Sequence, residues 1–275
     1  MPSSSQSAAV SWTPLVYFWE GGWIGVGRPP ASAVVPPREH HAVQIALGLD
    51  GSIRLQDPEG QWKEHRLAVV QADVRHAFDP GGALISLLFV DADGREGRWL
   101  RDSLRAPITD LSLDLVASHL PALLAFREAR PGPAAAGRIV TGVVEALCQG
   151  PPPLRSMDQR VARALELMRA DRSGRLGLSA VAAQVFLSPS RFAHLFATEV
   201  GLPFRRYLLW RKLNRAMGEF GRGATLSAAA HAAGFADSAH LTRTWRAMFG
   251  ITPSTMVGRA EFYEIPAPFE VARAA

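Results

Sequence analysis

Short runs of β-prone residues, separated by turn residues, fill the first third of the chain. Leu15–Trp19 and Trp23–Val26 flank Glu20-Gly21-Gly22, a pattern typical of a β-hairpin with a glycine turn. Runs of the same kind predict further strands at Ala42–Leu49, Ser52–Leu55, Leu67–Val70 and Ala83–Val90. Short strands at this spacing predict a small barrel or sandwich.

Helical periodicity replaces this pattern from residue 108 onward. Apolar residues three or four apart predict helices at Ile108–Leu120 and Ala134–Gln149. The loop Ala129–Pro133 between them favours an antiparallel pair. The apolar stripe of the second helix suits either the core of its own domain or the contact between two copies of the chain.

A proline-rich segment, Gly150-Pro151-Pro152-Pro153, divides the chain. It can neither continue a helix nor supply strand donors, so it predicts a stiff linker. Beyond it, Asp158 is a suitable N-cap for a helix over Gln159–Ala170. We predict a first domain at residues 1–149, a linker at 150–157, a helical domain at 158–260 and a tail at 261–275.

The helical half contains an internal repeat. Leu178–Ala182 recurs 48 residues later as Leu226–Ala230, and beyond the turn the offset is 49 residues. The predicted caps of the first helices are Ser179 and Ser227, and the second helices begin near Ser188 and Asp237. Two short helices in this order are typical of a helix-turn-helix unit, whose second helix enters the major groove of DNA.

The turn inside the unit differs between the two copies. The second copy has Gly234-Phe235, where glycine supplies the positive φ. The first copy has Phe186 at the glycine position. A phenylalanine is strained at positive φ, so a different turn geometry is open to the first copy.

Each predicted second helix has an apolar face and a polar face. The inward residues of the first are Phe192, Leu195, Phe196 and Val200, and those of the second are Leu241, Trp245, Met248 and Phe249. The outward residues are Ser190, Arg191, Ala193, His194 and Ala197 in the first, and Ser238, Ala239, Thr242, Arg243 and Arg246 in the second.

A longer helix is predicted between the two units, at Pro203–Phe220, with Pro203 at its first position. It is suited to hold the two second helices at a fixed separation. Successive major grooves on one face of DNA lie about 34 Å apart, a distance that two such helices can match.

Charge is distributed unevenly along the chain. Residues 1–154 carry 13 basic and 16 acidic residues, whereas residues 155–260 carry 16 basic and 6 acidic ones. Nearly all the basic residues are arginine, which suits bidentate contacts with phosphates and base edges. The helical half is therefore predicted to meet a polyanion, and the acidic half to sense an effector or partner.

Several classes of protein are excluded by composition. Cys148 is the single cysteine, so an intramolecular disulfide framework and a cysteine-based zinc cluster are excluded. The longest apolar runs, such as Ala83–Val90, are too short for a membrane span. Met1–Val10 lacks the features of a secretory signal, and the expected compartment is the cytoplasm.

The helical half resembles the AraC/XylS-type transcription regulators over about residues 158–257. The residues that carry the resemblance are Leu187-Ser188-Pro189-Ser190-Arg191-Phe192, Leu195-Phe196 and Gly201, then Ala233-Gly234-Phe235, Ser238, His240-Leu241, Arg243 and Phe249-Gly250-Ile251-Thr252-Pro253. The resemblance implies a seven-helix domain with two helix-turn-helix units. The chain departs from the family pattern at Thr255-Met256-Val257, which puts the last helix and its phosphate contact in doubt.

The resemblance also implies DNA-contacting residues. Base contacts are expected from Ser190, Ala193, His194, Ser238, Ala239, Thr242 and Arg243. Arg243 is the strongest candidate because an arginine can bond guanine O6 and N7 together. Arg191 and Arg246 are also expected at the DNA, and phosphate contacts are expected from Ser179, Arg205, Arg206, Arg211, Lys212 and Ser227. For each outer arginine a merely solvated role is the alternative.

The N-terminal half resembles, over fewer residues, the cupin-like sensor domains of the same family. The similarity lies in Glu39-His40-His41-Ala42-Val43-Gln44 and in His76 near Pro80-Gly81-Gly82. Gln44 stands where metal-binding cupins have a carboxylate, and an amide is an inferior ligand, so no metal or other cofactor is expected. The residues expected in an effector pocket are Trp23, His40, His41, Gln44 and His76.

The sequence therefore predicts an α+β protein of two domains: a cupin-like β-barrel with a helix pair, followed by an all-α domain with two helix-turn-helix units. The predicted function is a DNA-binding transcription regulator that responds to a small molecule. Its expected partners are double-stranded DNA, the effector, a second copy of the chain and RNA polymerase.

Two alternatives remain open. One is an enzyme, either a cupin-type catalyst or a methyl-acceptor repair protein that uses Cys148. The other is a regulator or interaction module that needs no effector and keeps the N-terminal domain only as a scaffold.

Overall fold

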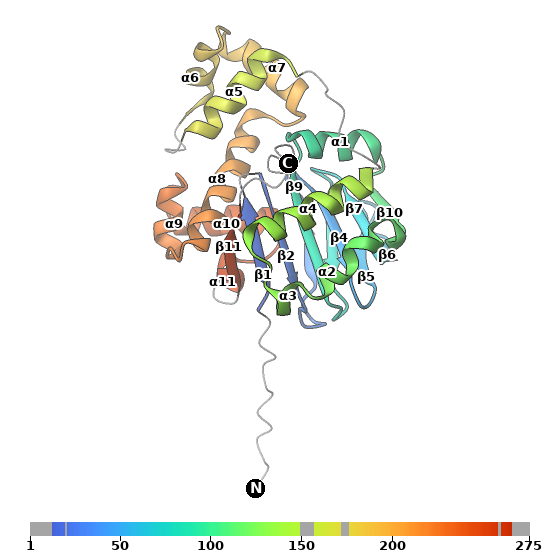
Figure 1. Cartoon of the computed structure of the whole chain (residues 1–275). Helices are drawn as coiled ribbons and strands as arrows, with labels where there is room; N and C mark the ends of the chain where they lie inside the picture. The colour runs from blue at the N-terminus through green and yellow to red at the C-terminus, as the bar shows by residue number, and fades with distance from the viewer. Residues whose placement is uncertain (1–12, 20, 149–156, 172–175, 258–259, 266–275) are drawn as a thin grey trace.

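Two β-sheets and a group of helices form the N-terminal part of the molecule, and helices form the C-terminal part (Figure 1). The computed structural model describes residues 13–19, 21–148, 157–171, 176–257 and 260–265. The predicted linker at Gly150–Pro153 and the N-terminal segment Met1–Val10 lie outside these residues. The predicted fold class, a sheet-rich domain followed by an all-helical one, is confirmed.

The larger sheet has seven strands in the order β10-β7-β4-β9-β2-β1-β11. Its pairs are antiparallel except β1 with β11, which run parallel. The strands are β1 (Leu15–Trp19), β2 (Gly22–Gly27), β4 (Ala42–Gly48), β7 (Leu67–Val70), β9 (Ile85–Asp91), β10 (Ile108–Leu111) and β11 (Glu261–Glu264). The predicted hairpin is present as β1 and β2, and Gly21 in its turn has a φ of +106°.

The smaller sheet has four strands in the order β3-β8-β5-β6. They are β3 (Val35–Arg38), β5 (Ile53–Gln56), β6 (Trp62–His65) and β8 (His76–Asp79). Of these, only β5 was predicted. Strand β3 contains Pro36 and Pro37, which cannot donate to a ladder; it lies at the sheet edge and pairs with β8 alone, with an irregular register.

The predicted helix at Ile108–Leu120 is wrong over its first residues, and the rest is a 3-10 helix rather than an α-helix. Residues 108–111 form β10, which pairs with β7, and Leu113–His119 form the 3-10 helix η1. Ser112 separates the two elements, because its hydroxyl accepts a hydrogen bond from the backbone N–H of Asp114 at 3.2 Å. A helix that was not predicted, α1 (Arg95–Ser103), follows β9.

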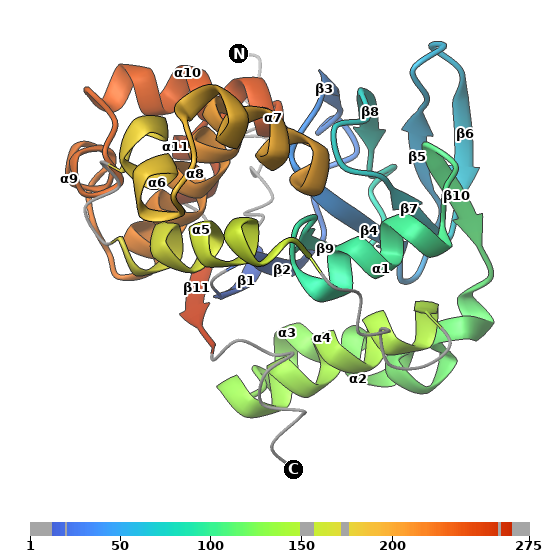
Figure 2. The ribbon, with the colours of Figure 1, turned by 90° about the horizontal axis from the view of Figure 1, so that it is seen from above.

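The second predicted helix is present as α4 (Pro133–Cys148), after two short helices, α2 (Leu120–Leu124) and α3 (Phe126–Ala129). These helices cover one face of the larger sheet (Figures 1 and 2). Val140, Val143 and Val144 of α4 are fully buried in one cluster with sheet residues such as Ile45 and Val69. The apolar stripe of α4 thus belongs to the core of its own domain.

The C-terminal part consists of helices with the predicted repeat. They are α5 (Gln159–Ala170), α6 (Leu178–Gln184), α7 (Pro189–Val200), α8 (Phe204–Gly221), α9 (Leu226–Ala232), α10 (Ser238–Phe249) and α11 (Pro253–Val257). Asp158 caps α5 as predicted, because its side chain accepts from the backbone N–H of Arg160 at 2.9 Å. Pro203 is the N-cap of α8 rather than its first helical residue.

The predicted caps of the two shorter helices are wrong. Gly177 is the N-cap of α6 and makes no side-chain cap bond, so Ser179 lies inside the helix. Thr225 is the N-cap of α9, and its hydroxyl accepts from the backbone N–H of Ala228 at 3.2 Å. Each serine therefore lies two residues beyond the cap position, where its exposed hydroxyl is not needed by the helix end.

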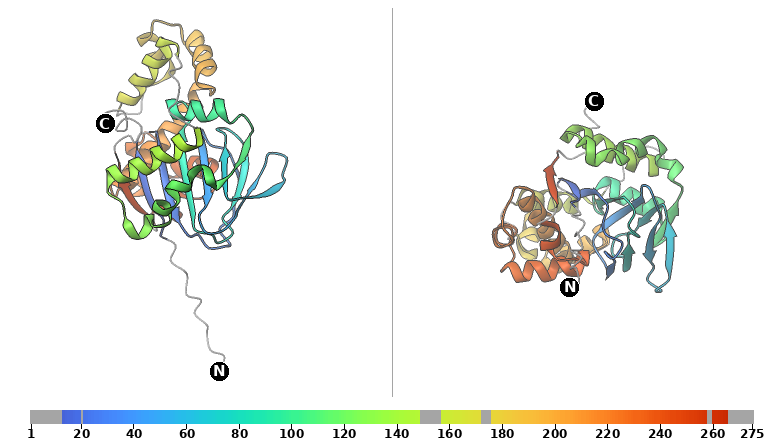
Figure 3. Two further views of the ribbon diagram at one scale, coloured as in Figure 1. Left: turned by 45° about the vertical axis from the view of Figure 1, so that its right-hand side comes forward. Right: turned by 90° about the horizontal axis from the view of Figure 1, so that it is seen from below.

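The residues expected as a tail return to the N-terminal sheet. Strand β11 pairs with β1 in the register Leu15 with Glu261 to Phe18 with Glu264, and Figure 3 shows the two strands side by side. Beyond it, Ile265 is 3% exposed and packs into the N-terminal core. The last part of the chain thus ties the helical part to the sheet.

The two parts of the molecule also share a hydrophobic cluster. From the sheet it takes Val16, Phe18, Trp23, Ala42 and Phe89, and from the helices it takes mainly residues of α8 and α10, among them Trp210, Leu213, Trp245 and Phe249. Because buried apolar area dominates the stability of such contacts, this cluster fixes the helical part against the sheet.

Candidate functional site

The first helix-turn-helix unit consists of α6 and α7. Ser188 caps α7, because its hydroxyl accepts from the backbone N–H of Arg191 at 3.4 Å. Phe192, Phe196 and Val200 are buried, as predicted, and Leu195 is half-buried. On the opposite face Ser190, Arg191 and His194 are exposed, and Ala193 is half-buried.

The second unit, α9 and α10, has the same construction. Asp237 caps α10, because its carboxylate accepts from the backbone N–H of His240 at 2.6 Å. Leu241, Trp245 and Phe249 are buried, and Met248 is half-buried. The outward residues are Ala239, Arg243 and Arg246, which are exposed, and Ser238 and Thr242, which are half-buried.

The turns of the two units share one geometry, contrary to the expectation that the first could differ. Phe186 has a φ of +57° and Gly234 one of +79°. The N–H of Leu187 donates to Ala182 O at 3.0 Å, and that of Phe235 donates to Ala230 O at 2.9 Å. The hydrogen bonds of the turn therefore hold Phe186 in the left-handed conformation, with its side chain 95% exposed.

Helix α8 joins the units and buries Trp210, Leu213, Met217 and Phe220. It also carries four of the predicted phosphate contacts. Arg205 is exposed. Arg206 instead forms an ion pair with Glu39 at 2.6 Å, which links the helical part to the sheet.

The other two predicted phosphate contacts on α8 contact the backbone of their own domain. Arg211 donates to Met168 O at 3.3 Å, and Lys212 donates to Gly234 O at 2.6 Å. These bonds satisfy carbonyls near the ends of α5 and α9, so both side chains have a structural role. Ser179 and Ser227, the remaining predicted phosphate contacts, are exposed.

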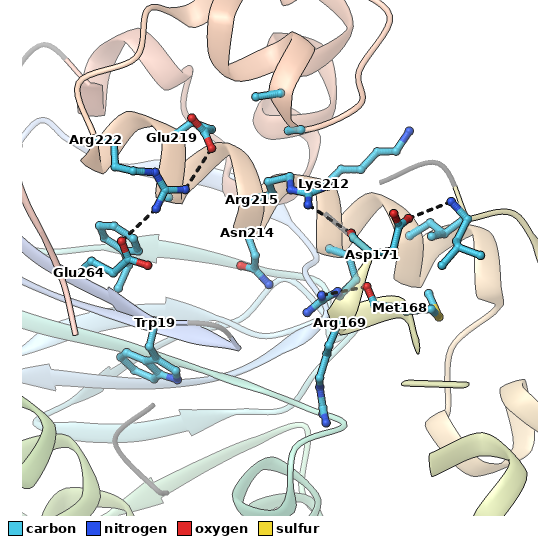
Figure 4. Close-up of a pocket in the computed structure, with 17 residues that line it drawn as sticks. Trp19, Met168, Arg169, Asp171, Lys212, Asn214, Arg215, Glu219, Arg222 and Glu264 are labelled. Atoms are coloured by element: carbon cyan, nitrogen blue, oxygen red, sulfur yellow. Dashed lines mark hydrogen bonds and ion pairs between the residues drawn. The ribbon is translucent and has the colours of Figure 1, made fainter. Parts of the chain in front are cut away.

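A polar cavity of about 530 Å³ lies between the two parts of the molecule (Figure 4). Its walls come mainly from β1, β11, α5 and α8, and they include both basic and acidic side chains. Figure 4 shows Arg222 between two carboxylates, Glu219 at 3.0 Å and Glu264 at 2.9 Å. The basic side chains of this cavity are thus largely engaged with protein oxygens.

Three of the predicted effector residues meet inside the N-terminal domain. His40 Nε2 lies 3.0 Å and His76 Nε2 3.2 Å from Gln44 Oε1, and all three residues are at most 1% exposed. Burial is the main cause that lowers the pKa of both histidines, to about 4 for His40, and the charge of Arg38 lowers it further. Both rings are therefore neutral near pH 7, as buried polar groups without counter-ions tend to be.

The other two predicted effector residues lie elsewhere. Trp23 is on the wall of a second cavity, described below. His41 points toward the contact between the two parts of the molecule, where Nδ1 lies 2.8 Å from Asp73 and Nε2 3.0 Å from Asp93. Consecutive residues of an extended chain point to opposite sides, which separates His41 from His40.

His41 is held between two carboxylates. Burial by itself lowers the pKa of His41, but the hydrogen bonds and charges of Asp73 and Asp93 outweigh it and raise the pKa to about 9. The same contact includes Tyr207 of α8, whose ring centroid lies 6.3 Å from that of His41. A protonated His41 therefore lies where α8 meets the sheet.

The second cavity, of about 250 Å³, lies where the N-terminal sheets meet the end of α10. Its walls are apolar apart from a few polar atoms, and they include Trp23, Phe78, Leu87, Phe89, Phe249 and Ile251. Arg38 also lines it, 5% exposed. The sequence did not single out Arg38, because an arginine after two prolines is typical of a surface loop.

Cys148 is buried at the end of α4. Burial, with a smaller effect of the Glu96 charge, raises the pKa of its thiol to about 12. A methyl acceptor needs a thiolate, so Cys148 has the properties of a packing residue.

Comparison with known protein families gives a match in the helical part of the chain. Residues 181–259 match a family model described as a helix-turn-helix domain. The C-terminal part of this chain is an AraC-type DNA-binding domain. The predicted resemblance of the helical half is thereby confirmed. No curated protein matches the sequence.

The whole fold is similar to that of ToxT from Vibrio cholerae. A ligand-free single-substitution variant of ToxT aligns with a TM-score of 0.59 and 9% identity over 87% of this chain and 97% of that chain. ToxT with an unsaturated fatty acid bound aligns with a TM-score of 0.53 and 11% identity over 91% of this chain and 96% of that chain. At these identities the likeness establishes the two-domain fold alone.

Within the residues that the structure describes, no helix is long and apolar enough to cross a bilayer, and no group of three or more His, Cys, Asp or Glu side chains is arranged to hold a metal ion. Gln44 supplies an amide where a carboxylate would be needed, and the Arg38 guanidinium lies nearby, with Nη2 3.5 Å from Gln44 Oε1. A positive charge at this place opposes a cation.

Proposed function

We propose that this protein is a transcription regulator that reads a specific DNA sequence with both helix-turn-helix units and changes its DNA affinity when a small molecule binds the N-terminal domain. The observation that carries the proposal is the matching construction of the two units. Each second helix is capped at its start and buried on one face, and each presents polar or basic side chains on the other.

Base reading is assigned to the outward faces of α7 and α10. His194 and Arg243 are the main candidates, because both are exposed and both can bond a purine in the major groove. Arg191, Arg205 and Arg246 are exposed and suited to phosphates, which fix position without reading sequence. For Arg206, Arg211 and Lys212, the contacts with protein oxygens favour a structural role over a phosphate contact.

The effector response rests on how the two parts join. The end of α10 forms part of the wall of the second cavity, so an occupant of the N-terminal domain would touch the second reading helix. A ligand shifts an equilibrium only through different affinities for its two states, and a wall shared between domains provides such a difference. ToxT, a protein of similar fold, has been solved with an unsaturated fatty acid bound, which supports a small-molecule effector here.

A homodimer and a contact with RNA polymerase are retained as proposals. The apolar stripe of α4 does not support the dimer, since it is buried in its own domain. The enzyme alternative is disfavoured by the buried, protonated thiol of Cys148 and by the family of the helical domain.

The proposal is tested by DNA binding to the region upstream of the protein's own gene, measured by fluorescence anisotropy at several salt concentrations. We expect tight binding to that duplex, weaker binding to a random duplex, and a steep loss with salt, because phosphate contacts release counterions. The double variant His194→Ala and Arg243→Ala should lose at least tenfold in specific affinity, from about 1–3 kcal/mol for each base contact.

The matched control is Arg163→Ala, which removes one exposed arginine of α5 outside both reading helices. Equal binding of specific and random duplexes would overturn the proposal. Full DNA binding that no candidate metabolite alters would favour the regulator without an effector.

A further inference from the structure

Arg38 is a buried cation without an anionic partner among the described residues. Its Nη1 donates to His76 O at 3.2 Å, and its Nη2 makes a long contact of 3.5 Å with Gln44 Oε1. Its Nε is buried and makes no hydrogen bond. The side chain is 5% exposed, and the described carboxylates form no ion pair with it.

A charge in this position is costly. Burying an ion without a counter-ion costs far more than burying a paired one, and proteins normally avoid it. Burial lowers the pKa of Arg38 only to about 9, so the guanidinium is still charged at neutral pH. Its neighbours do not neutralise it, because His40 and His76 are neutral and Gln44 is an amide.

The cavity beside Arg38 is apolar and large enough for a small organic molecule. Arg38 is the one charged side chain among the described residues that line it. A cavity of about 150 Å³ lined by aliphatic side chains holds a benzene molecule. The present cavity, at about 250 Å³, therefore accommodates a larger apolar body.

We propose that this cavity binds an organic monocarboxylic acid with an apolar body larger than benzene, and that Arg38 holds its carboxylate. This inference deepens the proposed function, on which it rests, by naming the chemical class of the effector. Arginine presents a planar fork of donors that matches a carboxylate, and one positive charge matches one negative charge. A phosphate dianion would need further donors, which the apolar walls do not offer.

The bound acid would contact both parts of the molecule. Phe249 and Ile251, at the end of α10, line the cavity together with Trp23 and Phe89 of the sheet. A Cβ added to Gly250, which has a φ of +74°, would lie 2.5 Å from Val35 Cγ1 and 3.2 Å from Arg38 Cδ. Helix α10 thus ends directly on β3, so an acid seated on Arg38 lies under the reading helix of the second unit.

The test measures binding of decanoic acid and of 1-decanol to the full-length protein by calorimetry, with the intrinsic tryptophan fluorescence, to which Trp23 in the cavity wall contributes, as a second signal. The unaltered protein should bind the acid at least tenfold more tightly than the alcohol, since a bond to a charged group contributes about 1.5–3 kcal/mol. In Arg38→Gln the acid should lose at least tenfold in affinity while the alcohol is little affected. Arg28→Gln, which removes an exposed arginine paired with Asp50, should leave both affinities unchanged.

A thermal melt of each ligand-free variant shows whether Arg38 is instead a structural residue. Because Arg38→Gln removes an unpaired buried charge, its melting temperature should equal or exceed that of the unaltered protein. Equal affinities for acid and alcohol in the unaltered protein, or equal losses of both in Arg38→Gln, would overturn the inference.

The outcome for the effector response is read separately, by DNA affinity with and without decanoic acid. Arg38-dependent binding of the acid without a change in DNA affinity would uphold the ligand class and overturn the effector response. A DNA response to other metabolites, without Arg38-dependent binding of the acid, would uphold the effector response and overturn the ligand class.

Discussion

The turn of the first helix-turn-helix unit places a phenylalanine where the second unit has a glycine. Both residues adopt positive φ, and both turns make the same backbone hydrogen bonds. For a residue with a Cβ this conformation costs about 1–2 kcal/mol, and glycine avoids the cost. The side chain of Phe186 gains little in return, because it is 95% exposed.

We therefore expect Phe186→Asn to raise the free energy of unfolding by about 1 kcal/mol, since asparagine tolerates the left-handed conformation better. The matched variant in the second turn, Gly234→Ala, should lower it by a similar amount, about 1 kcal/mol, because it introduces the same strain. Urea denaturation of both variants measures the two effects. A destabilised Phe186→Asn would mean that the phenylalanine makes a contact in solution that offsets its strain.

Arg243 carries the sharpest expectation for a single DNA contact. Arg243→Ala should weaken specific binding by about 1–3 kcal/mol and relax the preference at one base pair, because a bidentate bond to guanine is lost. Binding to a panel of operator variants with each base pair changed in turn measures this. Equal losses on specific and random duplexes would make Arg243 a phosphate contact instead.

At the scale of elements, the final strand shows how a terminal segment can join distant parts of the chain. Strand β11 follows the helical domain and completes the edge of the N-terminal sheet. Tyr263 stacks on Tyr17 with 5.1 Å between the ring centroids, and Glu261 pairs with Arg130 at 2.8 Å. Ile265, directly after the strand, is 3% exposed and packs into the N-terminal core.

Ile265→Ala is therefore expected to lower the free energy of unfolding by about 2–5 kcal/mol, because it leaves a cavity in the N-terminal core. The control Glu264→Gln removes an exposed ion pair with Arg222 and should cost at most about 1 kcal/mol. Urea denaturation of both variants measures the two changes in the free energy of unfolding. If both variants cost equally little, β11 does not dock on β1 in solution.

Sequence reasoning succeeded where local pattern decides the structure. The hairpin of β1 and β2, the bounds of α5 and the capped starts of α7 and α10 follow from turn glycines, cap residues and helical spacing. It failed where tertiary pairing decides. Residues 108–111 suit a helix by spacing, but β7 offers an open edge and they pair with it. Strand β3 has two prolines and is held by β8 and α10.

In the candidate sites, too, the features set by local sequence pattern were predictable and those set by tertiary contacts were not. The outward faces of α7 and α10 were predictable because helical periodicity separates them from the buried face. The role of Arg206 was not, because its partner Glu39 lies 167 residues away in the sequence. Arg38 was missed for the same reason: its burial depends on β8 and the end of α10, neither of which the sequence places beside it.

At the scale of the whole molecule, the contact between the two parts contains a group that titrates. His41 faces Asp73 and Asp93, with Asp91 and Tyr207 behind them and Arg206 of α8 beside Asp73. Its pKa is about 9, above the ordinary value of 6.5. A raised pKa means that protonated His41 stabilises the fold fully below pH 6.5 and that this stabilisation is lost as the pH rises through 9.

We expect the free energy of unfolding to fall by about 3 kcal/mol between pH 6.5 and pH 9, because a tenfold difference in proton affinity between the folded and unfolded chain corresponds to about 1.4 kcal/mol. Asp91, whose pKa is raised to about 6 by burial and by the nearby Asp93 charge, is ionised in most of this range and contributes little to the slope. In His41→Gln the fall should be much smaller. Parallel pH profiles for the two proteins would show that His41 does not carry a proton in the fold.

The arrangement of the two reading helices on α8 is the central claim, and hydroxyl-radical footprinting on the bound operator tests it most directly. We expect two protected patches on one face of the duplex, centred about one helical turn, or 10–10.5 base pairs, apart. His194→Ala should weaken one patch and Arg243→Ala the other. A single patch, or two patches on opposite faces of the duplex, would contradict the claim that both units read one stretch of DNA from a shared helix.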